Sequence, residues 1–168
     1  MVSEQQSAEA VYAIRSALVD LLRRNDYVIE NNAEGLSHED SLKRLGEGGS
    51  NLNWLLGHIT ASRGVCIKLL GAEPVFTSER ARVYKRGSSI PAAADAEPLA
   101  ELLSAAAEAG DRLRQALENA SADQLSRPNP RDAGERVLDA IYFLVWHDTY
   151  HAGQTALYRR LAGFSGKF

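Results

Sequence analysis

Two histidines, His147 and His151, lie four residues apart near the C-terminal end of the sequence. In an α-helix such residues share one face, and at about 100° per residue they fall in a mostly apolar or amphipathic column. The other members of this column are Ala140, Leu144, Gln154 and Tyr158. An imidazole on such a face points into the protein, where its ring nitrogens must form hydrogen bonds or bind a metal. Two imidazoles at this spacing can place both nitrogens on one ion.

His58 is the third candidate ligand, and it lies in a different helical segment. It falls on the flank of that segment's main apolar stripe, beside Trp54, Ala61 and Val65. This flank would face a neighbouring helix or the mouth of a cavity, and metal sites in bundles are built from facing helices. Three histidines leave a fourth tetrahedral position for water, as in catalytic zinc sites. The alternative is that all three are core histidines with satisfied hydrogen bonds.

Two further residues of the last helix are candidates for supporting roles. Asp148 is predicted to hydrogen-bond a ligand histidine or a nearby helix, and a weaker interpretation makes it a base for metal-bound water. Gln154 is predicted either to support the site or orient substrate, or to form a helix–helix hydrogen bond. In the metalloprotease motif His-Glu-x-x-His the second residue is glutamate, so His-Asp-x-x-His does not favour a protease.

The remaining reactive side chains are interpreted as structural or solvated. His38 lies in a polar segment and is predicted to be a solvated loop or helix-start residue. Cys66 belongs to an apolar stripe and is predicted to be a small hydrophobic residue. The basic pairs are predicted to be solvated, with binding of an anionic substrate as the alternative; they are Lys85 with Arg86 and Arg159 with Arg160.

Four helical patterns must position these residues, at about residues 7–31, 50–71, 95–120 and 132–162. Their predicted N-terminal caps are Ser3 with Gln6, Ser50, and Asp132 with Glu135. No stretch alternates for long enough to predict a strand, and residues 121–130 are predicted to form a turn. Four helices with one apolar stripe each can bury those stripes only against one another. We therefore expect residues 1–168 to form a single all-α domain, an antiparallel four-helix bundle with a long loop at residues 71–96.

Composition excludes several classes of protein. The chain has 168 residues, is 45% hydrophobic and carries a net charge of −3, which does not fit a dedicated nucleic-acid binder. Its one cysteine excludes an internal disulfide framework and suits a reducing compartment. Neither a secretory signal nor an apolar run of about 18 residues is visible, so we expect a cytoplasmic protein that does not enter membranes.

Two motifs carry a resemblance to a known family. Residues 53–59, Asn-Trp-Leu-Leu-Gly-His-Ile, and residues 147–154, His-Asp-Thr-Tyr-His-Ala-Gly-Gln, resemble the signatures of the DinB/YfiT-like metalloenzyme superfamily. The resemblance spans the whole chain. It implies a bundle with up-down-down-up connectivity, a nickel or zinc ion on His58, His147 and His151, and frequent homodimers. Known members include thiol-dependent S-transferases, a maleylpyruvate isomerase and hydrolases.

The sequence thus predicts an enzyme in which a divalent metal activates water or a low-molecular-weight thiol toward a small-molecule substrate, as a hydrolase or an S-transferase. The alternative is a non-catalytic metal-binding or interaction protein of the same fold. Apolar residues on more than one flank of the second helix also suggest burial against a second copy, so we expect a homodimer. The loop at residues 71–96 is the predicted determinant of substrate specificity.

Overall fold

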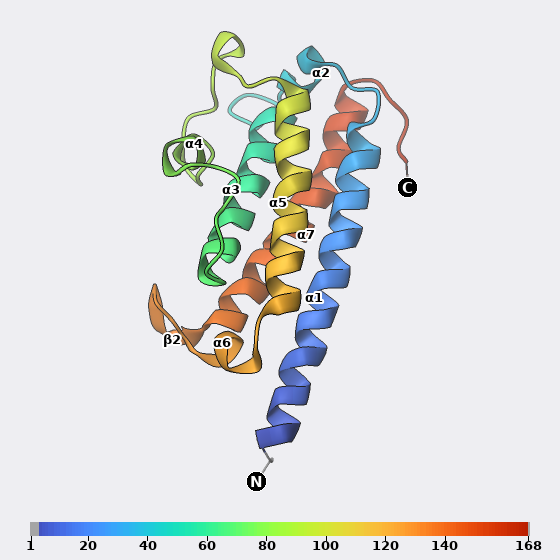
Figure 1. The fold of residues 1–168 in the computed structure, drawn as a ribbon. Helices are drawn as coiled ribbons and strands as arrows, with labels where there is room; N and C mark the ends of the chain where they lie inside the picture. Colours follow the sequence, from blue (N-terminus) through green and yellow to red (C-terminus); the bar gives the residue numbers. More distant parts are fainter. Residues whose placement is uncertain (1–3, 168) are drawn as a thin grey trace.

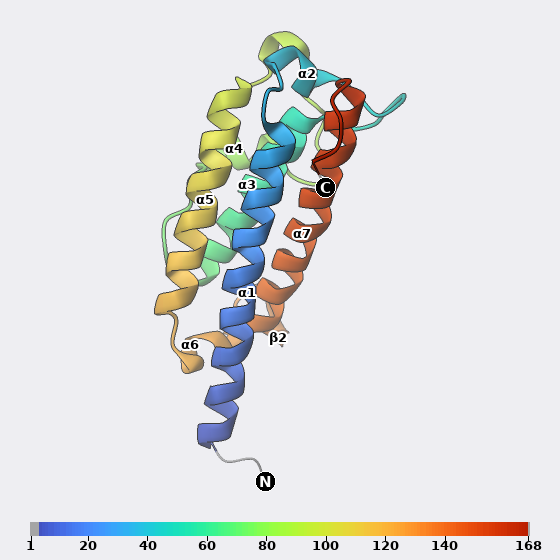
Figure 2. The same ribbon diagram turned by 90° about the vertical axis from the view of Figure 1, so that its right-hand side faces the viewer.

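The computed structural model describes residues 4–167, which fold into a bundle of four long helices (Figure 1). These are α1 (Glu4–Ala33), α3 (Leu52–Leu69), α5 (Leu99–Asn119) and α7 (Val137–Leu161). The connections contain α2 (His38–Leu42), α4 (Ser78–Val83), the 3-10 helix η1 (Ala93–Asp95), α6 (Ala122–Ser126), β1 (Pro128–Asn129) and β2 (Asp132–Arg136). Helices α1 and α7 run in one direction and α3 and α5 in the other (Figures 1 and 2). This order confirms the all-α, up-down-down-up bundle.

Each long helix packs against two others: α1 and α3 both contact α5 and α7. The apolar core consists of two clusters. One contains the N-terminal half of α1, the C-terminal halves of α3 and α5 and the start of α7, and the other contains the opposite ends of the same helices. Because burial of these stripes supplies the main driving force for folding, the four helices hold one another in fixed register.

A buried polar layer separates the two apolar clusters. The Arg63 guanidinium on α3 donates to both carboxylate oxygens of Asp148 on α7, with distances of 2.6 and 3.1 Å. It also donates to the Ala106 carbonyl on α5 at 2.7 Å and forms an ion pair with Asp26 on α1 at 2.7 Å. Asn25 donates to Asp148 at 2.8 Å. All four long helices therefore meet in one charged network.

The predicted long loop at residues 71–96 contains short helices and lies against α3. Phe76 and Tyr84 from this segment are buried in the same cluster as Leu55, Leu56 and Ile59 of α3. The second flank of α3, from which we expected a dimer, is thus covered by the chain itself.

The start of the fourth helix was predicted incorrectly. Residues 132–136 form β2, which pairs antiparallel with β1 in a two-stranded sheet, and α7 begins only at Val137. Both halves of the predicted cap are engaged elsewhere: Asp132 accepts from the Gly134 amide and Glu135 accepts from Asn129. At the observed start of α7, the Asp139 carboxylate instead accepts from the Arg136 amide. The missed sheet consists of only two short strands.

Other helix ends differ by a few residues. Asn51, not Ser50, caps α3, because its side chain accepts from the Trp54 amide. Helix α5 begins at Leu99 after Pro98, and the predicted turn at residues 121–130 contains α6 and β1. The predicted cap at Ser3 lies outside the described residues. No described helix has the length and apolar character needed to cross a bilayer.

Candidate functional site

The structure brings His58, His147 and His151 together between α3 and α7. The Nε2 atom of His147 lies 3.3 Å from Nε2 of His58 and 3.0 Å from Nε2 of His151. One ligand atom from each ring lies within 4.8 Å of the others. Two nitrogens bound tetrahedrally to zinc at about 2.0–2.1 Å are about 3.3 Å apart, so two of the three spacings already suit one ion.

His58 is oriented by a backbone carbonyl from the segment that covers α3. Its Nδ1 donates to the Tyr84 carbonyl at 2.6 Å, and the Trp54 ring stacks on the His58 ring, with centroids 4.8 Å apart. A proton on Nδ1 leaves the lone pair on Nε2, which is the nitrogen that faces the other histidines. The tautomer of His58 is therefore set by the position of Tyr84.

The residue before this histidine must be glycine because the ring of Tyr84 packs directly against it. A Cβ atom at position 57 would overlap the ring of Tyr84, so only glycine lets that ring lie directly on α3. The hydroxyl of Tyr84 donates to Glu97, which also pairs with Arg80, and these bonds fix the segment from its other side. The Gly-His motif thus combines a close approach with the hydrogen bond that this approach makes.

Replacing Gly57 with alanine is expected to displace Tyr84 and weaken metal binding by about 10–100-fold, because His58 loses the partner of its Nδ1. The overlap should also cost about 1–3 kcal/mol of stability. Isothermal titration calorimetry with Zn²⁺ and urea unfolding would measure the two effects. Gly153→Ala is the matched control, since a Cβ there meets nothing within 4 Å. Equal Zn²⁺ affinity in the two variants would contradict the role given to Gly57.

His151 is oriented by Gln154 from the next turn of α7. Its Nδ1 lies 2.7 Å from Oε1 of Gln154, whose amide nitrogen donates to the Tyr150 hydroxyl. With Nδ1 as the donor, the lone pair of His151 also lies on Nε2 and faces the cluster. Gln154 therefore contacts a candidate ligand directly, in keeping with the interpretation that it supports the site. Among the described residues it forms no hydrogen bond to another helix, which was the alternative interpretation.

The hydrogen-bonding groups of the cluster cannot all be satisfied without a cation, and His147 is the reason. It lies between two Nε2 lone pairs, and a proton on its own Nε2 can be donated to only one of them at a time. Its Nδ1 is buried and has no hydrogen-bond partner among the described residues. One cation would satisfy all three Nε2 atoms, so the donor set fits a divalent ion that accepts imidazole.

Electrostatics keep the three imidazoles neutral. Burial lowers the pKa of His58, His147 and His151, and for His147 the nearby His151 and His58 contribute as well, giving a pKa of about 4. The charge of Arg86 also acts to lower the pKa of His147. Only neutral imidazole binds metal, so at neutral pH the cluster is in its binding form.

The carboxylate of Asp148 is engaged away from the histidines. It is buried and accepts from Asn25 and Arg63, which is the nearby-helix alternative; none of its hydrogen bonds to the described residues reaches a histidine. Both carboxylate oxygens accept from Arg63, so the geometry does not favour Asp148 as a base for a ligand at the histidines. Burial alone would lower the pKa of Arg63, but Asp148 and Asp26 outweigh it and raise this pKa.

The sequence-based interpretations of His38, Cys66 and Arg159 can also be compared with the structure. His38 does begin a helix, α2, but its ring is half-buried and its Nδ1 accepts from the Leu99 amide at the start of α5. Cys66 is buried, and burial raises the pKa of its thiol, as expected for a small core residue. Arg159 was wrongly predicted to be solvated: it is buried, and its guanidinium donates to the carbonyls of Glu34 and Ser165.

A pocket of about 340 Å³ opens beside His58, between α3 and the segment that contains α4. Lys85 and Arg86, the other basic pair, are exposed side chains that line it. Arg131, from the turn between β1 and β2, lines it as well. The site is therefore open on one side, and that opening is formed partly by the segment at residues 71–96.

The fold and the site define a class: up-down-down-up helical bundles in which two facing helices bring three histidines together. A model of the DinB superfamily matches residues 21–155, and the chain belongs to this superfamily. No curated protein sequence matches it. A conserved protein from Enterococcus faecalis is similar in structure, with a TM-score of 0.70 and 14% identity over 88% of this chain and 95% of that one. YfiT from Bacillus subtilis, described as a probable metal-dependent hydrolase with an unusual four-helix bundle topology, has a TM-score of 0.62 and 17% identity over 98% and 92% of the two chains.

Proposed function

We propose that this protein is a metal-dependent enzyme in which His58, His147 and His151 bind one divalent cation. The observation that carries the proposal is the convergence of three Nε2 atoms, two of them on rings whose Nδ1 atoms are held by the Tyr84 carbonyl and Gln154. When bound, such a cation lowers the pKa of a water or thiol ligand and so supplies a nucleophile at neutral pH. The description of YfiT as a probable metal-dependent hydrolase supports this proposal.

The openness of the site favours an enzyme over the alternative, a non-catalytic metal-binding or interaction protein. A structural zinc site is closed by four protein ligands, whereas the group found among the described residues contains three. The pocket beside His58 lets a small molecule approach this member of the cluster. The rings of His58 and His151 are held in place by the Tyr84 carbonyl and Gln154.

Within this proposal, zinc and nickel are the expected ions because both accept imidazole nitrogen. The reaction is hydrolysis when water is the nucleophile, and S-transfer to an electrophile when a low-molecular-weight thiol takes its place. We expect the enzyme to act in the cytoplasm, in keeping with its single, buried cysteine.

Metal content and an activity screen test the proposal. The protein is purified without a histidine tag, its metals are measured by mass spectrometry, and ester hydrolysis, amide hydrolysis and thiol conjugation are assayed with and without a chelator. We expect one equivalent of metal and an activity that the chelator removes and zinc or nickel restores. Bound metal without any metal-dependent activity would favour the non-catalytic alternative. A chain that binds no metal would overturn the proposal and favour an interaction protein of this fold.

Metal occupancy is expected to be constant above about pH 6.5 and to fall as the pH is lowered toward about 4. The imidazoles have an ordinary pKa in the unfolded chain and a lowered pKa in the fold, that of His147 being about 4. The unfolded state therefore binds protons first, and the stability of the metal-free protein should decrease over the same range. Dialysis followed by metal analysis, and thermal unfolding of the metal-free protein, measure these two effects. Full occupancy at about pH 3, below the pKa of His147 in the fold, would contradict histidine ligation.

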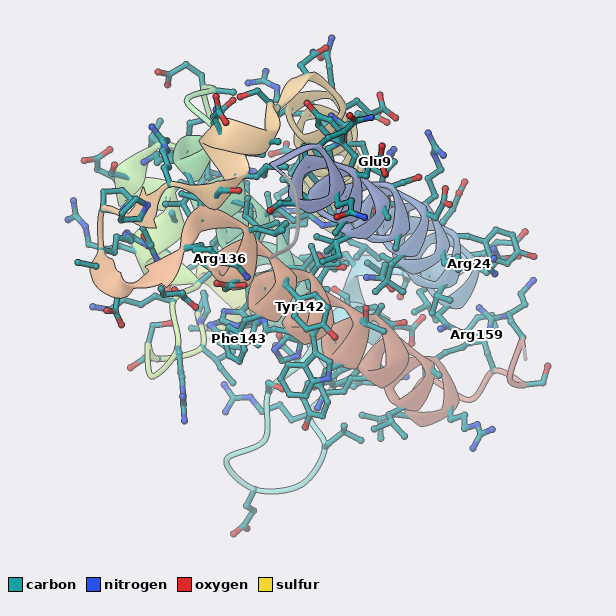
Figure 3. All side chains as sticks on the ribbon, turned by 90° about the horizontal axis from the view of Figure 1, so that it is seen from below. Glu9, Arg24, Arg136, Tyr142, Phe143 and Arg159 are labelled. Atoms are coloured by element: carbon teal, nitrogen blue, oxygen red, sulfur yellow. The ribbon has the colours of Figure 1, made fainter. Side chains whose placement is uncertain are left out.

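The homodimer also remains a proposal, with a different surface from the one first expected. Large apolar side chains are exposed along α7, and Figure 3 shows Phe143 on the side of this helix that faces away from α1. The stripe consists of Tyr142, Phe143, Trp146, Tyr150, Leu157 and Leu161. A second copy that covered it would bury an aromatic-rich face. Sedimentation at micromolar concentration should give twice the chain mass, and Trp146→Glu should give the monomer mass; a monomeric wild type would refute this proposal without affecting metal binding.

A further inference from the structure

The pocket beside His58 concentrates positive charge on an otherwise acidic protein. The chain carries a net charge of −3, yet five basic residues line this pocket and none of its described lining residues is acidic. The five are Lys68, Arg82, Lys85, Arg86 and Arg131. They come from three separate parts of the chain: α3, the α4 segment and the β1–β2 turn. The pocket therefore has a strongly positive rim.

Most of this charge has no partner within the protein. Among the described residues, Arg82 is the one member of the five in an ion pair, with Glu79 at 3.4 Å on the exposed surface. Such an exposed pair contributes little and leaves the guanidinium free to turn. Elsewhere on the molecule, by contrast, arginines such as Arg114 and Arg136 pair with nearby aspartates. Repulsion among unpaired cations favours binding of an anion.

The floor of the pocket is apolar. Val65 of α3 and Phe76 of the covering segment line it together with Ala61, Pro74 and Ala81. Phe76 is buried in the core, so this part of the floor is fixed by packing. A volume of about 340 Å³ is at the lower end of the range for small-molecule sites. The shape and lining suit a small molecule with an apolar body and anionic groups.

His58 belongs both to the pocket and to the histidine cluster. A molecule bound in the pocket therefore lies beside His58, one member of the cluster, while its anionic groups contact the basic rim. We propose that the substrates of this site are small organic anions, carboxylates or phosphate esters with an apolar body, held by this rim with their reacting group at the histidines. The inference deepens the proposed function and rests on it for the reaction, but anion binding itself does not require the metal.

Calorimetric titration of the metal-free protein tests the inference. The probes are isophthalate, its neutral analogue isophthalamide, and phenyl phosphate. We expect isophthalate to bind at least about tenfold more tightly than isophthalamide, and to bind more weakly as ionic strength rises. Comparison with phenyl phosphate shows which of the two oxyanions the rim prefers. Equal affinity for isophthalate and isophthalamide, or no saturable binding of either anion at millimolar concentration, would overturn the proposal.

Two double variants distinguish the pocket from general surface charge. Lys85→Gln with Arg86→Gln should weaken anion binding by about 5–25-fold, because two rim cations are lost. Arg24→Gln with Arg160→Gln removes the same net charge from exposed positions on α1 and α7 and should change affinity less than about twofold. Similar losses in both variants would overturn the inference. Wild-type protein that binds metal but does not distinguish the anion from the amide would refute the inference alone. Wild-type protein that binds the anion but takes up no metal when metal is supplied would refute only the proposed function.

Discussion

Replacing Arg63 with methionine is expected to lower the free energy of unfolding by about 3–5 kcal/mol. The Arg63 side chain is 1% exposed and that of Asp148 is 2% exposed. Removal of the guanidinium therefore leaves the buried Asp148 carboxylate without its counter-charge. The Ala106 carbonyl loses a donor at the same time, and Asn25 is the remaining side chain on α1 that donates to Asp148. Urea unfolding at neutral pH measures the loss.

Two further variants show that the effect comes from the uncompensated charge. Arg63→Met combined with Asp148→Asn should recover part of the loss, because the buried carboxylate is then neutral and can still accept from Asn25. Arg23→Met is the matched surface control: Arg23 pairs with Asp20 and Glu118, but its side chain is 57% exposed, so we expect a loss below about 1 kcal/mol. If Arg63→Met costs no more than Arg23→Met, the polar layer is not what joins the four helices.

The histidine cluster could be predicted from the sequence because its signal is local. His147 and His151 share one column of α7, whose members are buried or half-buried. His58 could be placed on a flank of α3 for the same reason. The hydrogen-bond partners of these rings differ in how far they lie from the histidines in the sequence. Gln154 is one turn away and was identified, whereas the Tyr84 carbonyl lies 26 residues from His58 and depends on how an irregular segment folds over Gly57.

The polar layer can also be recognised in the sequence, although not from the apolar residues alone. Arg63 has the same helical register as Leu56, Ile59 and Cys66, which are all buried. A charged residue in a core register must find an opposite charge, and Asp148 occupies the corresponding register of α7 between buried residues. What the sequence could not supply is which helices face each other, and hence which pairs form. The start of α7 was missed because Asp132 and Glu135 match a capping box in type and spacing, and only the β1–β2 pairing shows that they lie in a strand.

Replacing His147 with alanine is expected to abolish stoichiometric metal binding. His147 is the central member of the cluster, since its Nε2 lies within 3.3 Å of Nε2 on both other rings. Without it, His58 and His151 provide two ligands, and the loss of one of three should weaken binding by far more than the loss of a supporting hydrogen bond. Gln154→Leu removes the acceptor for Nδ1 of His151 but no ligand, and should therefore give an intermediate effect of about 10–100-fold.

Folding and metal binding can be separated in this experiment. The buried Nδ1 of His147 has no partner among the described residues, so its removal relieves an unsatisfied group and the metal-free variant should remain folded by circular dichroism. His38→Ala is the matched control, because His38 is the one histidine outside the cluster and should leave one equivalent of metal bound. Mass spectrometry of the metal content after dialysis distinguishes the variants. A folded His147→Ala protein that still holds one equivalent would show that the three rings meet for reasons of packing, and the metal centre would have to be sought elsewhere.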